Sequence, residues 1–163
     1  MESTPNQPIN QITNKPSRWK RILWDVFTYV AIVAVIVFGL PRFLVWSLGT
    51  PFPMAAITSG SMWPALKTGD LVFIQAVNKE QLEVGDIIVY DNKINNTFTI
   101  HRIVKLGEES ITTKGDANFG EDAPVRYDDV IGRTLEVFGG PVHIPYLGSI
   151  TVFASNLQKQ PAK

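Results

Sequence analysis

Residues 59–70 have the sequence S-G-S-M-W-P-A-L-K-T-G-D and lie between two short apolar runs, residues 54–57 and 71–74, that are typical of β-strands. Gly60, between two serines, can adopt backbone conformations that are closed to other residues. Pro64 fixes its own φ angle and favours an extended conformation for the residue before it. The stretch therefore predicts a rigid bend between two strands, with a serine hydroxyl held at the bend.

The serines of this bend are compatible with two interpretations. A serine fixed between strands, beside a glycine that lets backbone N–H groups converge, suits a nucleophile with an oxyanion site. A β-turn that contains serine and glycine for its turn geometry alone would have the same composition. These residues by themselves leave both interpretations open.

The same residues resemble the signature motif of the type I signal peptidases, S-x-S-M-x-P-T-L followed closely by G-D. A departure is Ala65, where the family usually has threonine. The resemblance implies that Ser61 is the nucleophile and that the hydroxyl of Ser59 assists the oxyanion hole. It also implies that the rest of the chain should supply a base, a membrane anchor and a catalytic domain outside the cytosol.

The composition of the 163-residue chain argues against several classes of function. The net charge is +0 and charged residues make up 18%, so nothing favours nucleic acid as a partner. The Cys count of 0 excludes disulfides, thiolate metal sites and the cysteine nucleophile that a sortase needs. With only 2 histidines, a histidine-rich metal site is not expected either. The length predicts one compact domain plus appendages, and no cofactor is expected.

The N-terminal part of the chain predicts a tail followed by a membrane anchor. Residues 1–17 are polar and contain several prolines, which is typical of a disordered tail. Residues 26–40 are almost wholly apolar and residues 43–46 extend them, so the region 18–48 reaches the roughly 20 residues that a membrane-spanning helix needs. Pro41 is expected to end or kink this helix. Basic residues cluster just before the apolar run: Lys15, Arg18, Lys20 and Arg21.

The charges around this helix predict its orientation. Because the basic cluster precedes the apolar run and little positive charge follows it closely, the positive-inside rule places the N-terminus in the cytoplasm. Everything after about residue 47 then lies on the extracytoplasmic or lumenal side of a single-pass membrane protein. Two alternatives compete: a cleaved signal peptide, which the bulky residues 43–46 argue against, and a buried core helix, which would not need basic flanks.

From residue 49 onward the pattern is that of a β domain. Short runs of strand type alternate with glycine and asparagine turn signals, and no helical period is evident. The expected strands cover residues 54–58, 71–77, 86–90, 97–104, 110–114 and 130–137. We predict a mainly β catalytic domain over residues 49–140, built as an antiparallel, coiled sheet of the signal-peptidase type. The apolar C-terminal segment, residues 141–163, is expected to supply a last strand and a short helix that closes the domain or lies on the membrane.

A base for Ser61 could come from a histidine or a lysine. His101 lies in the run T-F-T-I-H-R-I-V, residues 97–104, and a strand would hold its ring within hydrogen-bond reach of a fixed hydroxyl. In signal peptidases of the bacterial type the corresponding strand carries lysine, then arginine and two branched residues. The archaeal and endoplasmic-reticulum branch has histidine in place of that lysine, and the resemblance therefore implies that His101 is the base. Lys114 stays open as an alternative base, and His143 is expected to be structural.

The third motif, K-G-D-A-N-F-G-E-D at residues 114–122, resembles the K-G-D-N-N-x-x-D-D motif of the same family. A carboxylate can fix the tautomer of an imidazole and stabilise the imidazolium that forms during the reaction. The resemblance assigns Asp122 to this role and Asp116 to support of the loop. An alternative is a calcium loop with oxygen ligands from Asp116, Asn118 and Asp122, but it lacks the later glycine and the final glutamate of an EF-hand.

Together the three motifs imply a membrane-bound serine endopeptidase that removes N-terminal signal peptides from secreted preproteins by a Ser-His-Asp mechanism. The substrate would add as an extended strand near Met54, Ala56 and Ile57, where shallow apolar pockets admit small residues at the first and third positions before the cut. The implied partners are secretory preproteins and the lipid bilayer, with other signal peptidase subunits or the translocon left open. Two other classes are alternatives: a self-cleaving protease of the phage-repressor type with a Ser-Lys pair, and a membrane-anchored, non-catalytic β binding module.

Overall fold

The computed structural model describes residues 18–95, 97–150 and 153. The chain divides into two compact units, Met1–Leu40 and Pro41–Lys163. The predicted disordered tail lies outside the described residues, as does nearly all of the C-terminal segment after residue 150.

A helical segment begins at Arg18 and ends at Leu48. It consists of α1 (Arg18–Ala34), the π-helical turn η1 (Val35–Gly39) and α2 (Leu40–Leu48). By length and composition it could cross a membrane, because the mean hydropathy of its 18-residue window is 2.3. No residue of these three elements is buried, whereas a helix in the core of a soluble protein would bury one face.

Of the two outcomes expected at Pro41, an end or a kink of the helix, the end does not occur, because α2 continues to Leu48. Proline has no N–H, and its ring clashes with the carbonyl four residues earlier in a regular α-helix. The turn immediately before Pro41 is π-helical, and the N–H of Leu40 donates to the carbonyl of Val35. A wider turn of this kind is one of the ways in which a helix continues past such an irregularity.

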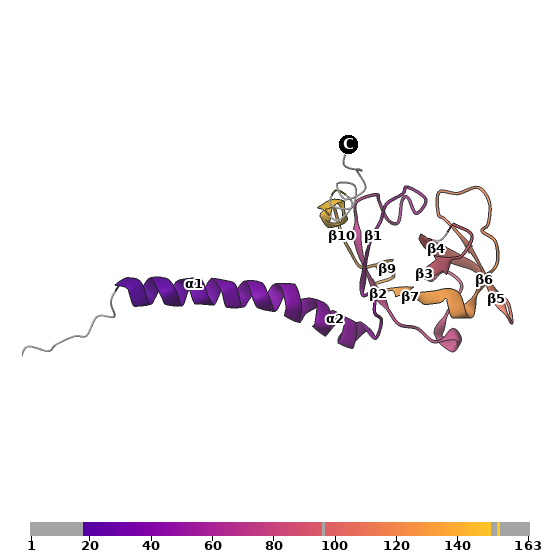
Figure 1. Ribbon diagram of the computed structural model, residues 1–163. Coiled ribbons are helices and arrows are strands. Elements are labelled where there is room, and N and C mark those ends of the chain that lie inside the picture. Colours follow the sequence, from indigo (N-terminus) through magenta and orange to yellow (C-terminus); the bar gives the residue numbers. More distant parts are fainter. Residues whose placement is uncertain (1–17, 96, 151–152, 154–163) are drawn as a thin grey trace, which may run out of the picture. The chain divides into compact units, whose positions relative to one another are not determined.

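The second unit is mainly β, as predicted (Figure 1). Its strands are β1 (Met54–Ala56), β2 (Leu71–Gln75), β3 (Ile87–Asn92), β4 (Thr97–Leu106), β5 (Ser110–Lys114), β6 (Val125–Arg126), β7 (Val130–Thr134), β8 (Glu136–Val137), β9 (Gly140–Pro141) and β10 (His143–Ile144). Two short 3-10 helices, η2 (Lys79–Gln81) and η3 (Tyr127–Asp129), connect them.

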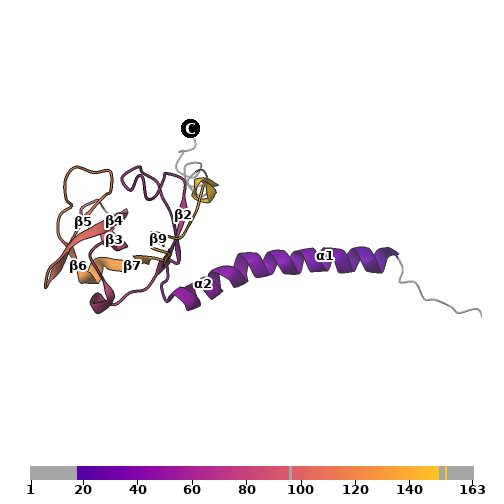
Figure 2. The same cartoon turned by 180° about the vertical axis from the view of Figure 1, so that it is seen from behind.

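All strand pairs are antiparallel. The main sheet has the order β1-β2-β7-β3-β4-β5-β6, with β10 paired to β2 beside this path, and β8 and β9 form a separate hairpin. Figure 1 shows β1 and β2 on one side of the unit and β5 and β6 on the other, and the view from behind in Figure 2 shows the same arrangement reversed. The start of β2 pairs with β1 and β10, and its end pairs with β7. Because β2 changes its partner strands along its length, the sheet coils.

The described strands differ from the predicted ones at two places in the catalytic domain, apart from small shifts of their ends. The short strand β6, Val125–Arg126, was not expected. The expected run 130–137 is two strands, because β7 pairs with β2 and β3 whereas β8 pairs with β9 in a separate hairpin. The C-terminal segment supplies β9 and β10 and a helical turn at residues 147–150.

Two clusters of buried side chains form the core. One cluster contains Leu82, Ile88, Tyr90, Ile103, Ile111 and Val125. The other contains Ile57, Met62, Leu66, Val72 and Ile87. The neighbours Ile87 and Ile88 of β3 belong to different clusters, as the alternation of side chains along a strand requires. The continuous apolar run of β3 thus reflects a strand that is covered on both faces.

The central strand β4 positions the histidine that the sequence singled out. His101 lies opposite Ile88 of β3 and two residues before Ile103, so its side chain is on the face of the first cluster. Its residue exposure is only 8%. The imidazole is therefore held on a rigid, internal strand.

Candidate active site

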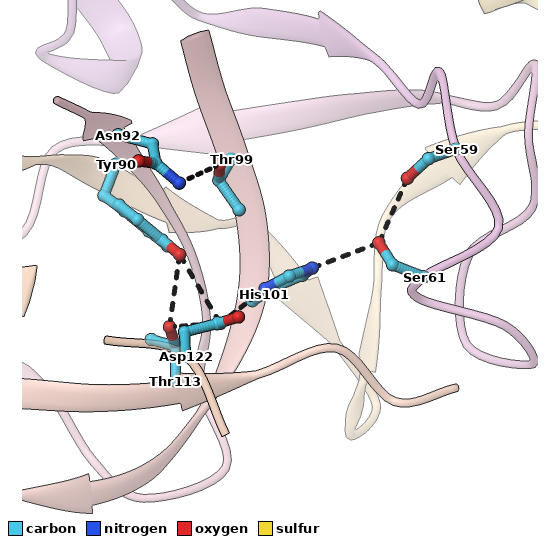
Figure 3. Close-up of polar contacts among 8 residues, drawn as sticks. All are labelled: Ser59, Ser61, Tyr90, Asn92, Thr99, His101, Thr113 and Asp122. Carbon is cyan, nitrogen blue, oxygen red and sulfur yellow. Dashed lines mark hydrogen bonds and ion pairs between the residues drawn. The ribbon is translucent and has the colours of Figure 1, made fainter. Parts of the chain in front are cut away.

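Three side chains from separate parts of the chain meet in one hydrogen-bond chain (Figure 3). Ser61 lies in the turn after β1, His101 lies on β4, and Asp122 lies in the irregular segment between β5 and β6. Ser61 and His101 are 40 positions apart in the sequence, and His101 and Asp122 are 21 apart. The fold thus brings together one residue from each of the three motifs.

Each ring nitrogen of His101 has its own partner. Nε2 is 3.1 Å from Oγ of Ser61, and Nδ1 is 2.6 Å from Oδ2 of Asp122. An ionised carboxylate only accepts hydrogen bonds, so Nδ1–H is the donor to Asp122. Nε2 of the neutral ring is then the acceptor for the hydroxyl proton of Ser61. This arrangement can move a proton from the serine to the imidazole.

The third motif also fixes the backbone of Ser61. The N–H of Ala117 donates to the carbonyl of Ser61 at 2.8 Å. A Cβ at Gly115 would lie 2.8 Å from the same carbonyl oxygen, closer than real Cβ contacts permit. The glycine of the K-G-D motif is therefore required by the close approach of the two loops.

A second hydroxyl lies beside the first. Oγ of Ser59 is 3.1 Å from Oγ of Ser61, and Ser59 is exposed while Ser61 is half-buried. A hydroxyl at this distance can donate to an oxygen that forms next to Ser61. The resemblance of the motif to the signal peptidases implied that Ser59 acts beside Ser61, and in the structure the two hydroxyls are within hydrogen-bond distance.

Asp122 has polar neighbours that the sequence did not single out (Figure 3). Oγ1 of Thr113 is 2.7 Å from Oδ2 of Asp122, and the hydroxyl of Tyr90 is 3.4 Å from the same oxygen. Burial raises the pKa of Tyr90 above its ordinary value, and the charge of Asp122 raises it further, while the nearby hydroxyl of Thr113 acts in the opposite direction. Tyr90 therefore keeps its proton at neutral pH.

Asp116 pairs with Arg102 and not with His101. Its two carboxylate oxygens accept from Nε and Nη2 of Arg102 at 2.8 and 2.7 Å. This hydrogen bonding raises the pKa of Arg102, although burial of the guanidinium acts against it. Arg102 also donates to the carbonyl of Gly85 at 2.7 Å. Because both oxygens of Asp116 are engaged by Arg102, the calcium-loop alternative loses one of its ligands.

Replacing Asp116 with alanine is expected to lower stability by about 1–3 kcal/mol, because Arg102 is left half-buried without its carboxylate partner. The loop whose Ala117 N–H holds the carbonyl of Ser61 should loosen as well. The free energy of unfolding of the β unit, from urea denaturation, is the measurement.

Asp128→Ala is the matched control for this prediction. The ion pair of Asp128 with Arg126 is exposed on both sides (82% and 74%), so its loss should change stability by less than about 0.5 kcal/mol. Equal destabilisation by the two variants would contradict a special role for the Arg102–Asp116 pair.

The two other candidate bases lie elsewhere. Lys114 is in register with Arg102, whereas Thr113 is in register with Ile103, on the face of His101. The side chain of Lys114 therefore lies on the opposite face of the sheet from the imidazole. Nδ1 of His143 lies 3.1 Å from Oδ2 of Asp70, whose other bond is to the N–H of Lys67. This pairing fits the expected structural role of His143.

A cleft of about 600 Å³ opens beside Ser61 and His101. Its lining includes the three residues that the sequence suggested for substrate binding: Met54, Ala56 and Ile57. Two aromatic residues that the sequence did not suggest also line it, Phe52 and Phe98, whose ring centroids are 5.2 Å apart. The lining is predominantly apolar, which suits a peptide with small apolar side chains.

Comparison with known proteins gives one consistent result. A family model described as signal peptidase, peptidase S26, matches residues 23–135. The signal peptidase complex catalytic subunit SEC11 of Colletotrichum graminicola is 37% identical over 114 residues, which cover 65% of this chain and 66% of that protein, just under two thirds. The subunit of the same name from Pyricularia oryzae is 33% identical over 126 residues (69% of this chain, 73% of that protein). The one from Neurospora crassa is 35% identical over 147 residues (77% of this chain, 81% of that protein).

Proposed function

Because the chain belongs to the signal peptidase family, peptidase S26, we propose that it is a membrane-bound serine endopeptidase that removes N-terminal signal peptides from secreted preproteins. The observation that carries this proposal is the hydrogen-bond chain from Ser61 through His101 to Asp122 at the wall of an apolar cleft. A non-catalytic binding module would have no use for such a chain.

In the proposed mechanism, Oγ of Ser61 attacks the carbonyl carbon of the scissile peptide bond while Nε2 of His101 accepts the hydroxyl proton. The carboxylate of Asp122 holds Nδ1–H and stabilises the imidazolium. The hydroxyl of Ser59 turns to donate to the oxyanion. His101 then gives its proton to the leaving amine, and a water molecule, deprotonated by the same imidazole, hydrolyses the acyl-enzyme and regenerates Ser61.

The substrate binds as an additional strand. β1 is the terminal strand in the order of the main sheet, and its residues Met54 and Ala56 line the cleft. An extended peptide can pair with such an edge. Alternate side chains of the peptide then enter the cleft, which places small residues at the first and third positions before the cut.

The membrane supplies proximity between enzyme and substrate. The helix Arg18–Leu48 anchors the chain, with the N-terminus in the cytoplasm and the β unit on the extracytoplasmic or lumenal side. The anchor and the signal peptide then share one bilayer, which raises the effective concentration of the cleavage region at the site. The relatives are named catalytic subunits of a signal peptidase complex, so further subunits are proposed partners.

A pair of preproteins that differ only at the residue before the cut tests this function. When the residue before the cut is alanine, the full chain in detergent should cleave the preprotein. When it is leucine, kcat/KM should be about 100-fold lower, because the larger side chain does not fit the cleft. Leucine one position earlier is the control, since that side chain points away from the cleft and should change the rate little. Equal cleavage with alanine and leucine before the cut would contradict the proposed substrate class.

A further inference from the structure

Thr113 makes two hydrogen bonds to Asp122, and neither the sequence motifs nor the family match assigns it a role. Its Oγ1 donates to Oδ2 of Asp122 at 2.7 Å. Its carbonyl accepts from the N–H of Asp122 at 2.8 Å. Thr113 is fully buried on β5. One rigid residue thus fixes both the backbone and the carboxylate of Asp122.

Asp122 has little local structure of its own to hold it. Residues 115–124 form turns and irregular chain between β5 and β6. The neighbours of Asp122 in the sequence, Glu121 and Ala123, are exposed. The direction of this carboxylate is therefore determined by its polar contacts, and those from the described residues (Tyr90, His101 and Thr113) come from the face of the sheet that carries His101.

The donors around Oδ2 can be assigned from their distances. Thr113 has one hydroxyl proton and two neighbours, Oδ2 of Asp122 at 2.7 Å and the hydroxyl of Tyr90 at 3.4 Å. The shorter bond to a charged acceptor is the stronger one, so the proton of Thr113 points to Asp122. Tyr90 is protonated and can add a weaker bond to the same oxygen at 3.4 Å. Oδ2 of Asp122 therefore accepts hydrogen bonds from His101 and from the hydroxyls of Thr113 and Tyr90.

We propose that Thr113 is a positioning residue for catalysis, whose hydroxyl keeps Oδ2 of Asp122 on Nδ1–H of His101, with Tyr90 as a weaker second support. The proposal rests on the proposed peptidase function. Without the hydroxyl, the carboxylate can rotate away and the imidazole loses the partner that sets its tautomer and orientation.

The expected signature is a change in kcat without a change in KM. Thr113 is buried and is not among the residues that line the cleft, so substrate binding should not sense its hydroxyl. Misalignment of the base weakens an interaction that matters only in the transition state, and such losses lower kcat and kcat/KM equally. We expect kcat of Thr113→Val to fall by about 10- to 100-fold, since valine has the shape of threonine without the donor.

The experiment measures preprotein cleavage by the full chain in detergent, together with the thermal midpoint Tm of each variant. Thr113→Ser keeps the donor and should restore kcat to within about threefold of wild type. Thr134→Val is the matched control: Thr134 is a buried strand threonine whose hydroxyl has no hydrogen-bond partner among the described residues. Its kcat should stay within about twofold of wild type, and its Tm should not fall.

Two results would overturn the proposal: wild-type kcat in Thr113→Val, with or without a raised KM, or failure of Thr113→Ser to recover the lost kcat. If Thr113→Val shows no cooperative unfolding, the proposal is tested with Tyr90→Phe, because this variant removes only the weaker hydrogen bond to Asp122. It should lower kcat about two- to fivefold at an unchanged Tm, and wild-type kcat would overturn the proposal. Absence of cleavage by wild type would instead refute the peptidase function, so the two failures are distinguishable.

Discussion

Replacing Ser61 with alanine should abolish preprotein cleavage, with a loss of at least about 10⁴-fold in kcat, because the nucleophile is removed from the hydrogen-bond chain. Removing one member of a unit of this kind has cost about as much as removing all of it in other serine proteases. The hydroxyl of Ser61 is within hydrogen-bond distance of His101 and Ser59, and Ser61 belongs to neither of the two core clusters. The fold should therefore survive, with Tm within about 3 °C of wild type.

Ser59→Ala is the natural comparison for this variant. Its hydroxyl lies next to Ser61 and would donate to the oxyanion, so its loss should lower kcat by about 10²- to 10³-fold, less than the loss of the nucleophile. Both rates are obtained from single-turnover cleavage of one preprotein, with circular dichroism as the check on folding. Cleavage by folded Ser61→Ala at more than a small fraction of the wild-type rate would refute the assignment of the nucleophile.

Replacing His101 with lysine should also inactivate the enzyme, by about 10³-fold or more, although signal peptidases of the bacterial type use lysine as the base. In this chain a carboxylate oxygen of Asp122 is placed 2.6 Å from Nδ1 of His101. An ammonium at this position would pair with that carboxylate, and an opposite charge favours the protonated form. A protonated lysine cannot accept the proton of Ser61.

The control for the lysine variant is His143→Gln, which changes the other histidine of the chain. His143 pairs with Asp70, outside the hydrogen-bond chain of Ser61, so kcat should stay within about threefold of wild type. A pH–rate profile of both variants is the measurement. Near wild-type cleavage by His101→Lys would show that the histidine and its carboxylate partner are not a required pair.

Much of the fold follows from short-range patterns in the sequence. Alternation of apolar residues predicted strands near those that form β2, β3, β4 and β5, and the run 110–114 coincides with β5. The apolar run after the basic cluster predicted one helix that could span a membrane, and the helix Arg18–Leu48 agrees in length and composition. The family that the motifs indicated is confirmed by the match over residues 23–135.

The features that the sequence did not predict depend on contacts between distant residues. The division into β7 and β8 follows from the pairing of β8 with β9, and the passage of the helix through Pro41 depends on a π-helical turn. Neither is visible in a local hydrophobic pattern. Apolar periodicity indicates which residues are buried but not which partner they meet.

The candidate site shows the same division. Ser61, His101 and Asp122 could be named because each lies in a motif of a known family. Thr113 and Tyr90 could not, because their importance comes from the register of β4 with β5 and β3. Alternation alone places Thr113 on one of two faces, and only the pairing of Ile103 with Thr113 identifies that face as the one that carries His101.

The most direct test of the central claim is the mass of the products that the wild-type chain releases from a preprotein in detergent. The account predicts two fragments that correspond to one cut, after a small residue that has another small residue two positions before it, and no fragments with Ser61→Ala. A preprotein that stays intact with folded wild-type enzyme, or the same two fragments with Ser61→Ala, would contradict the account.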